Sequence, residues 1–168
     1  MKERKDVVTF KGNYVTLVGE NFAEVGDIAP DFVAVDNSLN DVRLSDFVGK
    51  KVIISSVPSL DTPVCDIETK KFNELAKNFN DDVVILTISM DLPFAQKRWC
   101  GNNNVDNVKT ISDYKYREFG MKYGVYVKEL GLLARVIFVV DRDGKIKYKQ
   151  VVKEIGSEPN YSDVLENL

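Results

Sequence analysis

Two cysteines, Cys65 and Cys100, are the residues of this chain whose types point most directly to chemistry, because thiols serve as nucleophiles, redox groups and metal ligands. The chain has no histidine. That excludes Ser-His-Asp and Cys-His nucleophile arrangements and zinc sites built from cysteine and histidine. Two thiols are also too few for a structural zinc site, which takes four ligands. The chemistry must therefore come from thiols, carboxylates, hydroxyls, lysines or arginines.

Cys65 ends the stretch PSLDTPVC, which follows the apolar run VIISSV (52–57) and precedes a predicted helix. Thr62 is a good N-cap candidate, and Pro63 then falls at the first helical position. This numbering puts Cys65 in the first turn, beside backbone N–H groups that have no intrahelical partner. The positive end of the helix dipole stabilises a thiolate over a thiol, and the Thr62 hydroxyl can donate to the sulfur. The alternative is a small buried residue that opens a helix.

Arg135 is the one charged residue in the run LLARVIFVV (132–140). An arginine in the middle of a strand costs free energy unless it is paired or reaches solvent. One interpretation is that Arg135 points into the Cys65 site, where it would hold the thiolate and polarise a substrate oxygen. The other is an arginine at a strand end that pairs with Glu129 or is solvated. The residues alone do not separate the two.

The elements around these residues follow from their periodicity. VIISSV and VVILTIS (83–89) read as buried strands, and between them Phe72, Leu75, Ala76 and Phe79 form one apolar helical stripe. A strand–helix–strand unit of this kind has parallel strands and a right-handed crossover. Cys65 then lies where the carboxyl end of a strand meets a helix N-terminus, which is where sites form in open α/β sheets.

The remaining elements complete the predicted fold. Further predicted segments are a hairpin of 7–10 and 14–18, a loop up to the first buried strand, helices at 93–100, 114–124 and 161–168, a strand at 107–112, and a hairpin of 132–140 and 145–152. They predict one domain over 1–168 of the α/β class, with three layers and a mixed sheet. This arrangement resembles the thioredoxin fold with an N-terminal β-hairpin extension.

The charge and hydropathy of the chain indicate where the protein is located and what it binds. Its net charge is −3, whereas a nucleic-acid binder usually has an excess of basic residues. No apolar run approaches the roughly 20 residues of a membrane span. The first ten residues have no apolar segment typical of a signal peptide. We therefore expect a cytoplasmic protein that binds neither nucleic acid nor membrane.

Three segments carry a resemblance to a known family. Pro58, Thr62 and Cys65 occupy the fixed positions of the P-x-x-x-T-x-x-C signature of peroxiredoxins. That stretch, AQKRWC around Cys100 and GLLARVIFVVD around Arg135 are similar to the thiol peroxidase subfamily, the atypical two-cysteine type. The similarity runs over nearly the whole chain, and the three segments occur in the right order.

The resemblance implies a peroxidase that needs no metal, haem or flavin. Cys65 would be the peroxidatic cysteine, whose thiolate attacks one oxygen of hydrogen peroxide or an organic hydroperoxide and becomes a sulfenic acid. Thr62 and Arg135 would hold the thiolate and stabilise charge on the leaving oxygen. Pro58 would cover the pocket and limit the entry of water.

The resemblance also implies a role for Cys100. The local sequence alone favours a core residue of a helix, beside Trp99. As a member of this subfamily it would be the resolving cysteine, which forms an intramolecular disulfide with Cys65 that thioredoxin then reduces. A disulfide needs Cα atoms within about 7 Å, so we expect the segments around both cysteines to unwind locally. Such proteins are commonly homodimers.

Two other functions are open to a chain of this type. A thioredoxin-like disulfide oxidoreductase would have a second thiol where this chain has Thr62, and a proline before 132–140, where this chain has none. A redox-sensing module would use the same disulfide to change partners. Turnover of peroxide separates the peroxidase from the sensor.

Overall fold

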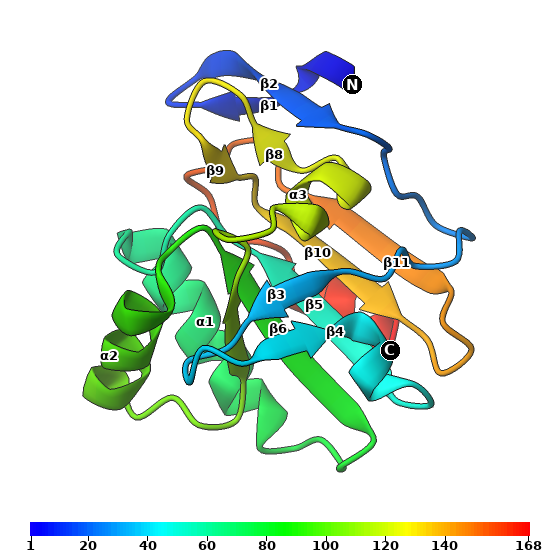
Figure 1. Ribbon diagram of the computed structural model, residues 1–168, viewed down its shortest axis with the longest axis vertical. Coiled ribbons are helices and arrows are strands. Elements are labelled where there is room, and N and C mark those ends of the chain that lie inside the picture. Colours follow the sequence, from blue (N-terminus) through cyan, green and yellow to red (C-terminus); the bar gives the residue numbers. More distant parts are fainter.

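The computed structural model describes residues 1–168 and contains two β-sheets with helices on both sides of the larger one (Figure 1). The seven-stranded sheet has the order β11-β10-β5-β6-β7-β3-β4. Its strands are β3 (Val33–Val35), β4 (Asp41–Arg43), β5 (Lys51–Ser56), β6 (Val83–Ser89), β7 (Lys109–Ser112), β10 (Val136–Val140) and β11 (Ile146–Val151). The four-stranded sheet contains β1 (Lys2–Phe10), β2 (Asn13–Gly19), β8 (Tyr126–Val127) and β9 (Leu132–Leu133).

The helices are short, and the predicted ones are present. They are α1 (Pro63–Ala76), α2 (Pro93–Asn103), α3 (Glu118–Tyr123) and α4 (Tyr161–Glu166), with a 3-10 turn η1 (Leu44–Phe47) before β5. β5, β6 and β7 are parallel neighbours, and β10 is antiparallel to both β5 and β11. The sheet is therefore mixed, as predicted.

Side chains on the two faces of the large sheet build two separate cores, because successive residues of a strand point to opposite faces. Ile53 packs in a cluster with Phe72 of α1 and Trp99 of α2. The next residue, Ile54, belongs to a larger cluster with Phe119 of α3 and with the four-stranded sheet. The predicted three layers are thus helices α1, α2 and α4, then the large sheet, then α3 with the small sheet.

The predicted N-terminal hairpin is confirmed, but it is longer and belongs to its own sheet. Lys11 and Gly12 form its turn with positive φ angles of 51° and 80°, the geometry that matches the twist of a two-residue hairpin. β8 and β9, which the sequence pattern did not predict as a hairpin, extend this sheet beyond β2. The small sheet lies at the top of Figure 1.

The single long strand predicted for 132–140 is wrong, because the chain changes sheets inside it. β9 ends at Leu133 in the small sheet, and β10 begins at Val136 in the large one. Between them, Ala134 donates its backbone N–H to Val125 (2.8 Å) and Arg135 accepts at its carbonyl from Val152 (3.1 Å). Arg135 therefore lies at the junction of the two sheets and not in the middle of a strand.

Other boundaries also differ from the prediction. The segment before β5, predicted as a loop, contains the short hairpin of β3 and β4 at the edge of the large sheet. α1 ends at Ala76, so Phe79 packs against its core cluster from a turn and not from the helix. α3 begins four residues later than predicted, at Glu118, because Arg117 before it has a left-handed backbone (φ 56°).

Asp113 explains where α3 begins. It is fully buried at the end of β7, and its carboxylate accepts the backbone N–H groups of Phe119 (3.1 Å) and Gly120 (2.8 Å). Burial raises the pKa of Asp113 to about 6, although both N–H groups favour its charged form. The chain ends α3 as predicted at Gly124, whose φ is 73°.

We expect Asp113 to make the protein less stable as the pH rises. Its pKa is about 3.9 when unfolded, so between that value and about 6 the folded state binds more protons. This group alone should lower the free energy of unfolding by about 2 kcal/mol between about pH 4 and pH 7. Urea unfolding of the parent and of Asp113→Asn across this range measures the effect. The parent-minus-variant difference should fall as pH rises, and a flat or rising difference would contradict the assignment.

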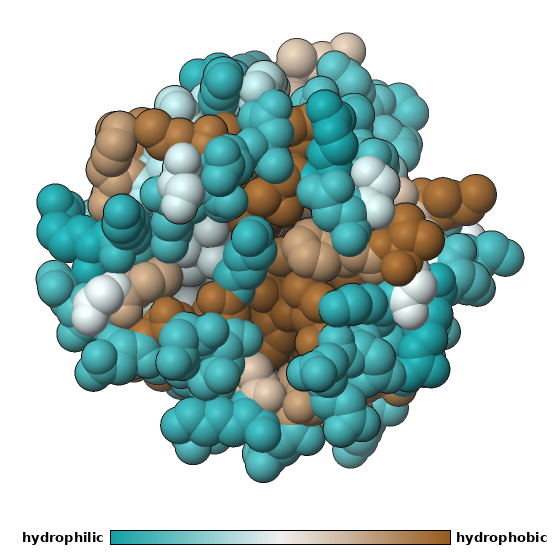
Figure 2. Space-filling model, turned by 60° about the horizontal axis from the view of Figure 1, so that its bottom comes forward, coloured by the Kyte–Doolittle hydropathy of each residue, from teal (hydrophilic) through white to brown (hydrophobic).

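No helix of this protein has both the length and the apolar character needed to cross a membrane. The surface is mostly hydrophilic, with exposed apolar side chains such as Ile28, Val48 and Phe94. In the view of Figure 2, apolar side chains gather in a central hollow that hydrophilic ones surround.

Candidate active site

Cys65 lies in the first turn of α1, at the end of the loop that leaves β5. Thr62 is the N-cap residue and Pro63 is the first residue of the helix, as the sequence predicts. The Cys65 side chain has an exposed fraction of 0% and packs in the core cluster beneath α1 and α2. The sulfur is thus held in a dry environment at the positive end of a helix.

Arg135 contacts Cys65 directly. Its Nη2 donates a hydrogen bond to the Cys65 sulfur at 3.2 Å, although the two residues are 70 positions apart. The guanidinium is buried, with a 2% exposed side chain, and its Nε donates to the carbonyl of Ile155 at 2.9 Å. Glu129, the alternative partner from the sequence, binds Thr16 instead through its carboxylate. The sheet junction therefore points Arg135 at the sulfur.

Glu68 is a buried member of this site that the sequence analysis missed. Its carboxylate pairs with Nη1 of Arg135 and accepts the hydroxyl of Ser55 of β5 at 3.0 Å. Its side chain is 0% exposed. Glu68 stands three positions after Cys65, on the same face of α1. That spacing, with a charged residue in an otherwise buried stripe, is the signal that would have identified it.

The charges of this site act on one another in a region from which water is excluded. Burial raises the pKa of Glu68, and Arg135 and the Ser55 hydroxyl oppose that shift only in part. Burial also disfavours the charged guanidinium, but the attraction of Glu68 and Cys65 outweighs it and raises the pKa of Arg135. Arg135 therefore stays positively charged between one carboxyl group and one sulfur. The guanidinium is thus placed to balance negative charge that develops on the sulfur or on an oxygen bound beside it.

The loop over Cys65 is fixed by hydrogen bonds, and Thr62 does not make the contact that its sequence position suggests. Its hydroxyl donates to the carbonyl of Ser59 at 2.9 Å and caps no backbone N–H of α1. Pro58 is buried at the start of this loop. Asp91, which follows β6, accepts from the Ser59 hydroxyl (2.7 Å) and from the backbone N–H of Leu60 (2.8 Å). Asp91 is a second residue of the site region that the sequence analysis missed.

Cys100 lies in α2 and is partly exposed. Both cysteines are free thiols, and the Cys100 sulfur contacts the hydroxyl of Thr110 at 3.4 Å. The preceding residue, Trp99, donates its indole N–H to Asp66 at 2.9 Å, which ties α2 to the first turn of α1. Cys100 also lines a cleft of about 480 Å³ between the start of β6, the start of β7 and the loop after β3.

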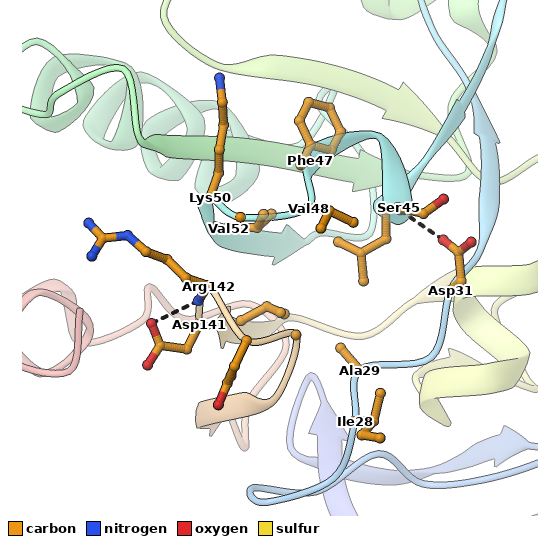
Figure 3. A pocket seen from close by; sticks show the side chains of 15 residues that line it. Ile28, Ala29, Asp31, Ser45, Phe47, Val48, Lys50, Val52, Asp141 and Arg142 are labelled. Carbon is orange, nitrogen blue, oxygen red and sulfur yellow. Dashed lines mark hydrogen bonds between the residues drawn. The ribbon is translucent and has the colours of Figure 1, made fainter.

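A second cavity of about 230 Å³ lies at the end of β5 that is remote from Cys65 (Figure 3). It is lined by Val52 and Val140, which pair at the far end of β5 and β10, whereas Arg135 precedes the pairing of Val136 with Ser56. Figure 3 shows the loop after η1 and the turn around Arg142 on either side of this cavity. No reactive thiol faces it. No cluster of three or more carboxylates and thiols is placed to hold a metal ion.

A buried thiol at a helix N-terminus, bound by an arginine on a mixed α/β sheet, defines a thiol-dependent redox enzyme of the thioredoxin-like class. The family model described as Redoxin matches residues 24–165. The chain belongs to the redoxin family and has thiol-dependent peroxidase function.

Named relatives agree with this assignment. A thiol peroxidase of Bacillus subtilis is 52% identical over 159 residues, which cover 95% of this chain and 94% of the relative. A thiol peroxidase of Staphylococcus aureus is 51% identical over 158 residues, 94% of each chain. A crystal structure of a peroxiredoxin-like protein from Aquifex aeolicus superposes with a TM-score of 0.90 at 44% identity, covering 99% of this chain and 96% of that one.

Proposed function

We propose that Cys65 is the peroxidatic cysteine. The observation that carries the proposal is the hydrogen bond from Arg135 to a buried sulfur at the N-terminus of α1. The Cys65 thiolate attacks one peroxide oxygen, the O–O bond breaks, and the sulfur becomes a sulfenic acid. The leaving oxygen departs with a proton as water or an alcohol. Arg135 balances the charge of the thiolate and of the leaving oxygen.

Thr62 and Pro58 act on the substrate side of the sulfur. The Thr62 hydroxyl is satisfied by Ser59 in the resting protein, so it has to turn about its side-chain bond to donate to a bound peroxide oxygen. Pro58 is buried in the loop that leads to Thr62, where its ring excludes water from the sulfur. A dry pocket slows further oxidation of the sulfenic acid to the sulfinic acid.

Cys100 completes the cycle as the resolving cysteine. Its sulfur attacks the Cys65 sulfenic sulfur, the S–S bond forms, the S–O bond breaks, and water leaves with the Cys100 proton. Thioredoxin then reduces this disulfide by thiol exchange. Support comes from the chain itself, which contains no third thiol, and from the partial exposure of Cys100.

The setting of this cycle follows from the same chemistry. Free thiols and a thioredoxin-type reductant require a reducing compartment, so we place the protein in the cytoplasm. The substrates are hydrogen peroxide and organic hydroperoxides. We also propose that residues 1–168 form one peroxiredoxin domain and that the working form is a homodimer.

One equivalent of hydrogen peroxide added to the fully reduced protein tests the cycle. Intact and peptide masses should show the loss of two hydrogens and a crosslink between Cys65 and Cys100. In Cys100→Ser the crosslink should be absent, and Cys65 should accumulate as sulfenic and then sulfinic acid, because nothing resolves the first product. Cycling with thioredoxin should fall to the background in this variant.

The possible results discriminate between functions. An oxidised Cys65 beside a free Cys100 in the parent protein would mean a one-cysteine peroxidase with an external resolving thiol. Reduction of insulin disulfides without turnover of peroxide would mean a disulfide oxidoreductase. Rapid formation of the disulfide without turnover by thioredoxin would favour a redox-sensing module.

A further inference from the structure

Thr110 of β7 joins the Cys100 sulfur to Asn37. Its hydroxyl donates to Oδ1 of Asn37 at 3.0 Å and lies 3.4 Å from the Cys100 sulfur. A hydroxyl has one proton, and that proton goes to Asn37. The Cys100 thiol must therefore be the donor to Thr110. This chain of two hydrogen bonds holds the Cys100 side chain against β7.

The contact lies at one end of a row of hydroxyl side chains on the helix-covered face of the sheet. Ser55 of β5, Thr87 of β6 and Thr110 of β7 are direct neighbours across the three parallel strands. Ser55 donates to Glu68, the partner of Arg135, so the Cys65 network begins at the other end of this row. Neighbouring strands are about 4.8 Å apart, which separates the two ends by about 10 Å.

The two cysteines are free thiols that contact different partners, so a disulfide requires them to move toward each other. It needs Cα atoms within about 7 Å and sulfurs about 2 Å apart. Cys65 is held by Arg135 on one side, and Cys100 is held by Thr110 on the other. Cys100 must therefore leave Thr110 before it can reach the Cys65 sulfur, and the hydrogen bond to Thr110 opposes that departure.

We propose that Thr110, positioned by Asn37, is a clasp that holds Cys100 and sets the rate of the resolving step. The proposal rests on the disulfide cycle given above. When the clasp opens, the Cys100 thiol condenses with the Cys65 sulfenic acid, an S–S bond replaces the S–O bond, and water carries away the thiol proton. Until it opens, the sulfenic acid is exposed to a second peroxide molecule. Thr110 is thus a positioning residue that also sets sensitivity to overoxidation.

The test is Thr110→Val, which keeps the shape of the side chain and removes the hydroxyl. Stopped-flow fluorescence of Trp99, the one tryptophan, follows hydrogen peroxide mixed with reduced protein and separates sulfenic acid formation from disulfide formation. We expect the second phase to be about two- to fivefold faster, the factor that a weak hydrogen bond is worth. The peroxide concentration that gives half conversion of Cys65 to sulfinic acid should rise by the same factor.

Thr87→Val is the matched control, because it makes the same chemical change in the same row. Thr87 is 1% exposed and its hydroxyl has no hydrogen-bond partner, so the substitution removes no contact with either cysteine. Its second phase should equal that of the parent. Thr110→Ser, which retains the hydroxyl, should restore the parental rate and the parental sensitivity to overoxidation.

The outcomes separate this proposal from the cycle on which it rests. If the parent forms the disulfide but Thr110→Val forms it no faster, or more slowly, the proposed role of Thr110 is refuted and the proposed disulfide cycle is not. If Thr87→Val accelerates as much as Thr110→Val, the effect is one of core packing and the clasp is refuted. If the parent forms no Cys65–Cys100 disulfide, both the cycle and the clasp are refuted.

Discussion

Replacement of Cys65 by serine is expected to lower peroxidase turnover by about 10,000-fold or more, the order of loss seen when a catalytic nucleophile is removed. A serine hydroxyl is not oxidised by peroxide, and no other side chain in contact with Arg135 contains sulfur. Cys100, which remains, lies in α2, where its sulfur contacts the hydroxyl of Thr110 and accepts no hydrogen bond from an arginine. The residual activity should equal that of a free thiol in solution.

Consumption of hydrogen peroxide with a thioredoxin reducing system measures this effect. Cys100→Ser is the matched control, since it removes the other thiol by the same atom change and should keep the first oxidation of Cys65. The two variants should therefore differ in the initial burst of peroxide consumption. A burst of parental size in Cys65→Ser would remove Cys65 from the reaction.

Replacement of Arg135 by methionine should affect both rate and stability. The second-order rate constant with hydrogen peroxide should fall by about 100- to 1,000-fold, because the thiolate and the leaving oxygen lose their one buried cation. The free energy of unfolding should fall by about 3–5 kcal/mol, because Glu68 is left buried without its partner. Stopped-flow fluorescence of Trp99 measures the rate, and urea unfolding measures the stability.

A double variant separates these two effects. Adding Glu68→Gln to Arg135→Met removes the unpaired buried charge and keeps an oxygen that can accept the Ser55 hydroxyl. We expect the double variant to recover most of the lost stability and none of the lost rate. If the rate returned with the stability, Arg135 would support the fold around Cys65 and take no part in its chemistry.

Local sequence patterns predicted the central elements of this protein well, because the conformation of these elements depends mainly on residues that are close together in the chain. The β-branched runs at β5 and β6 and the apolar stripe of α1 predict the central strand–helix–strand unit. Pro63 after Thr62 fixes the helix start and so the location of Cys65 at its N-terminus. Gly124 predicts the end of α3, since its positive φ angle suits glycine.

Predictions failed where contacts distant in sequence decide the conformation. The split of the apolar run 132–140 is set by Val125 and Val152, which bind the backbone of Ala134 and Arg135. The late start of α3 is set by the buried carboxylate of Asp113. The periodicity of 132–140 and of α3 does not identify these distant partners.

The sequence by itself identified the cysteines that we propose carry the chemistry. The absence of histidine, the two cysteines and the Pro58-Thr62-Cys65 spacing predict a thiol at a helix N-terminus as the reactive group. Only the tertiary structure decided what surrounds that thiol. Arg135 and Cys65 are 70 positions apart, and they meet because the chain crosses from one sheet to the other just before Val136. Glu68, Asp91 and Thr110 likewise act through partners on other elements, because hydrogen bonds and ion pairs depend on distance in space and not along the chain.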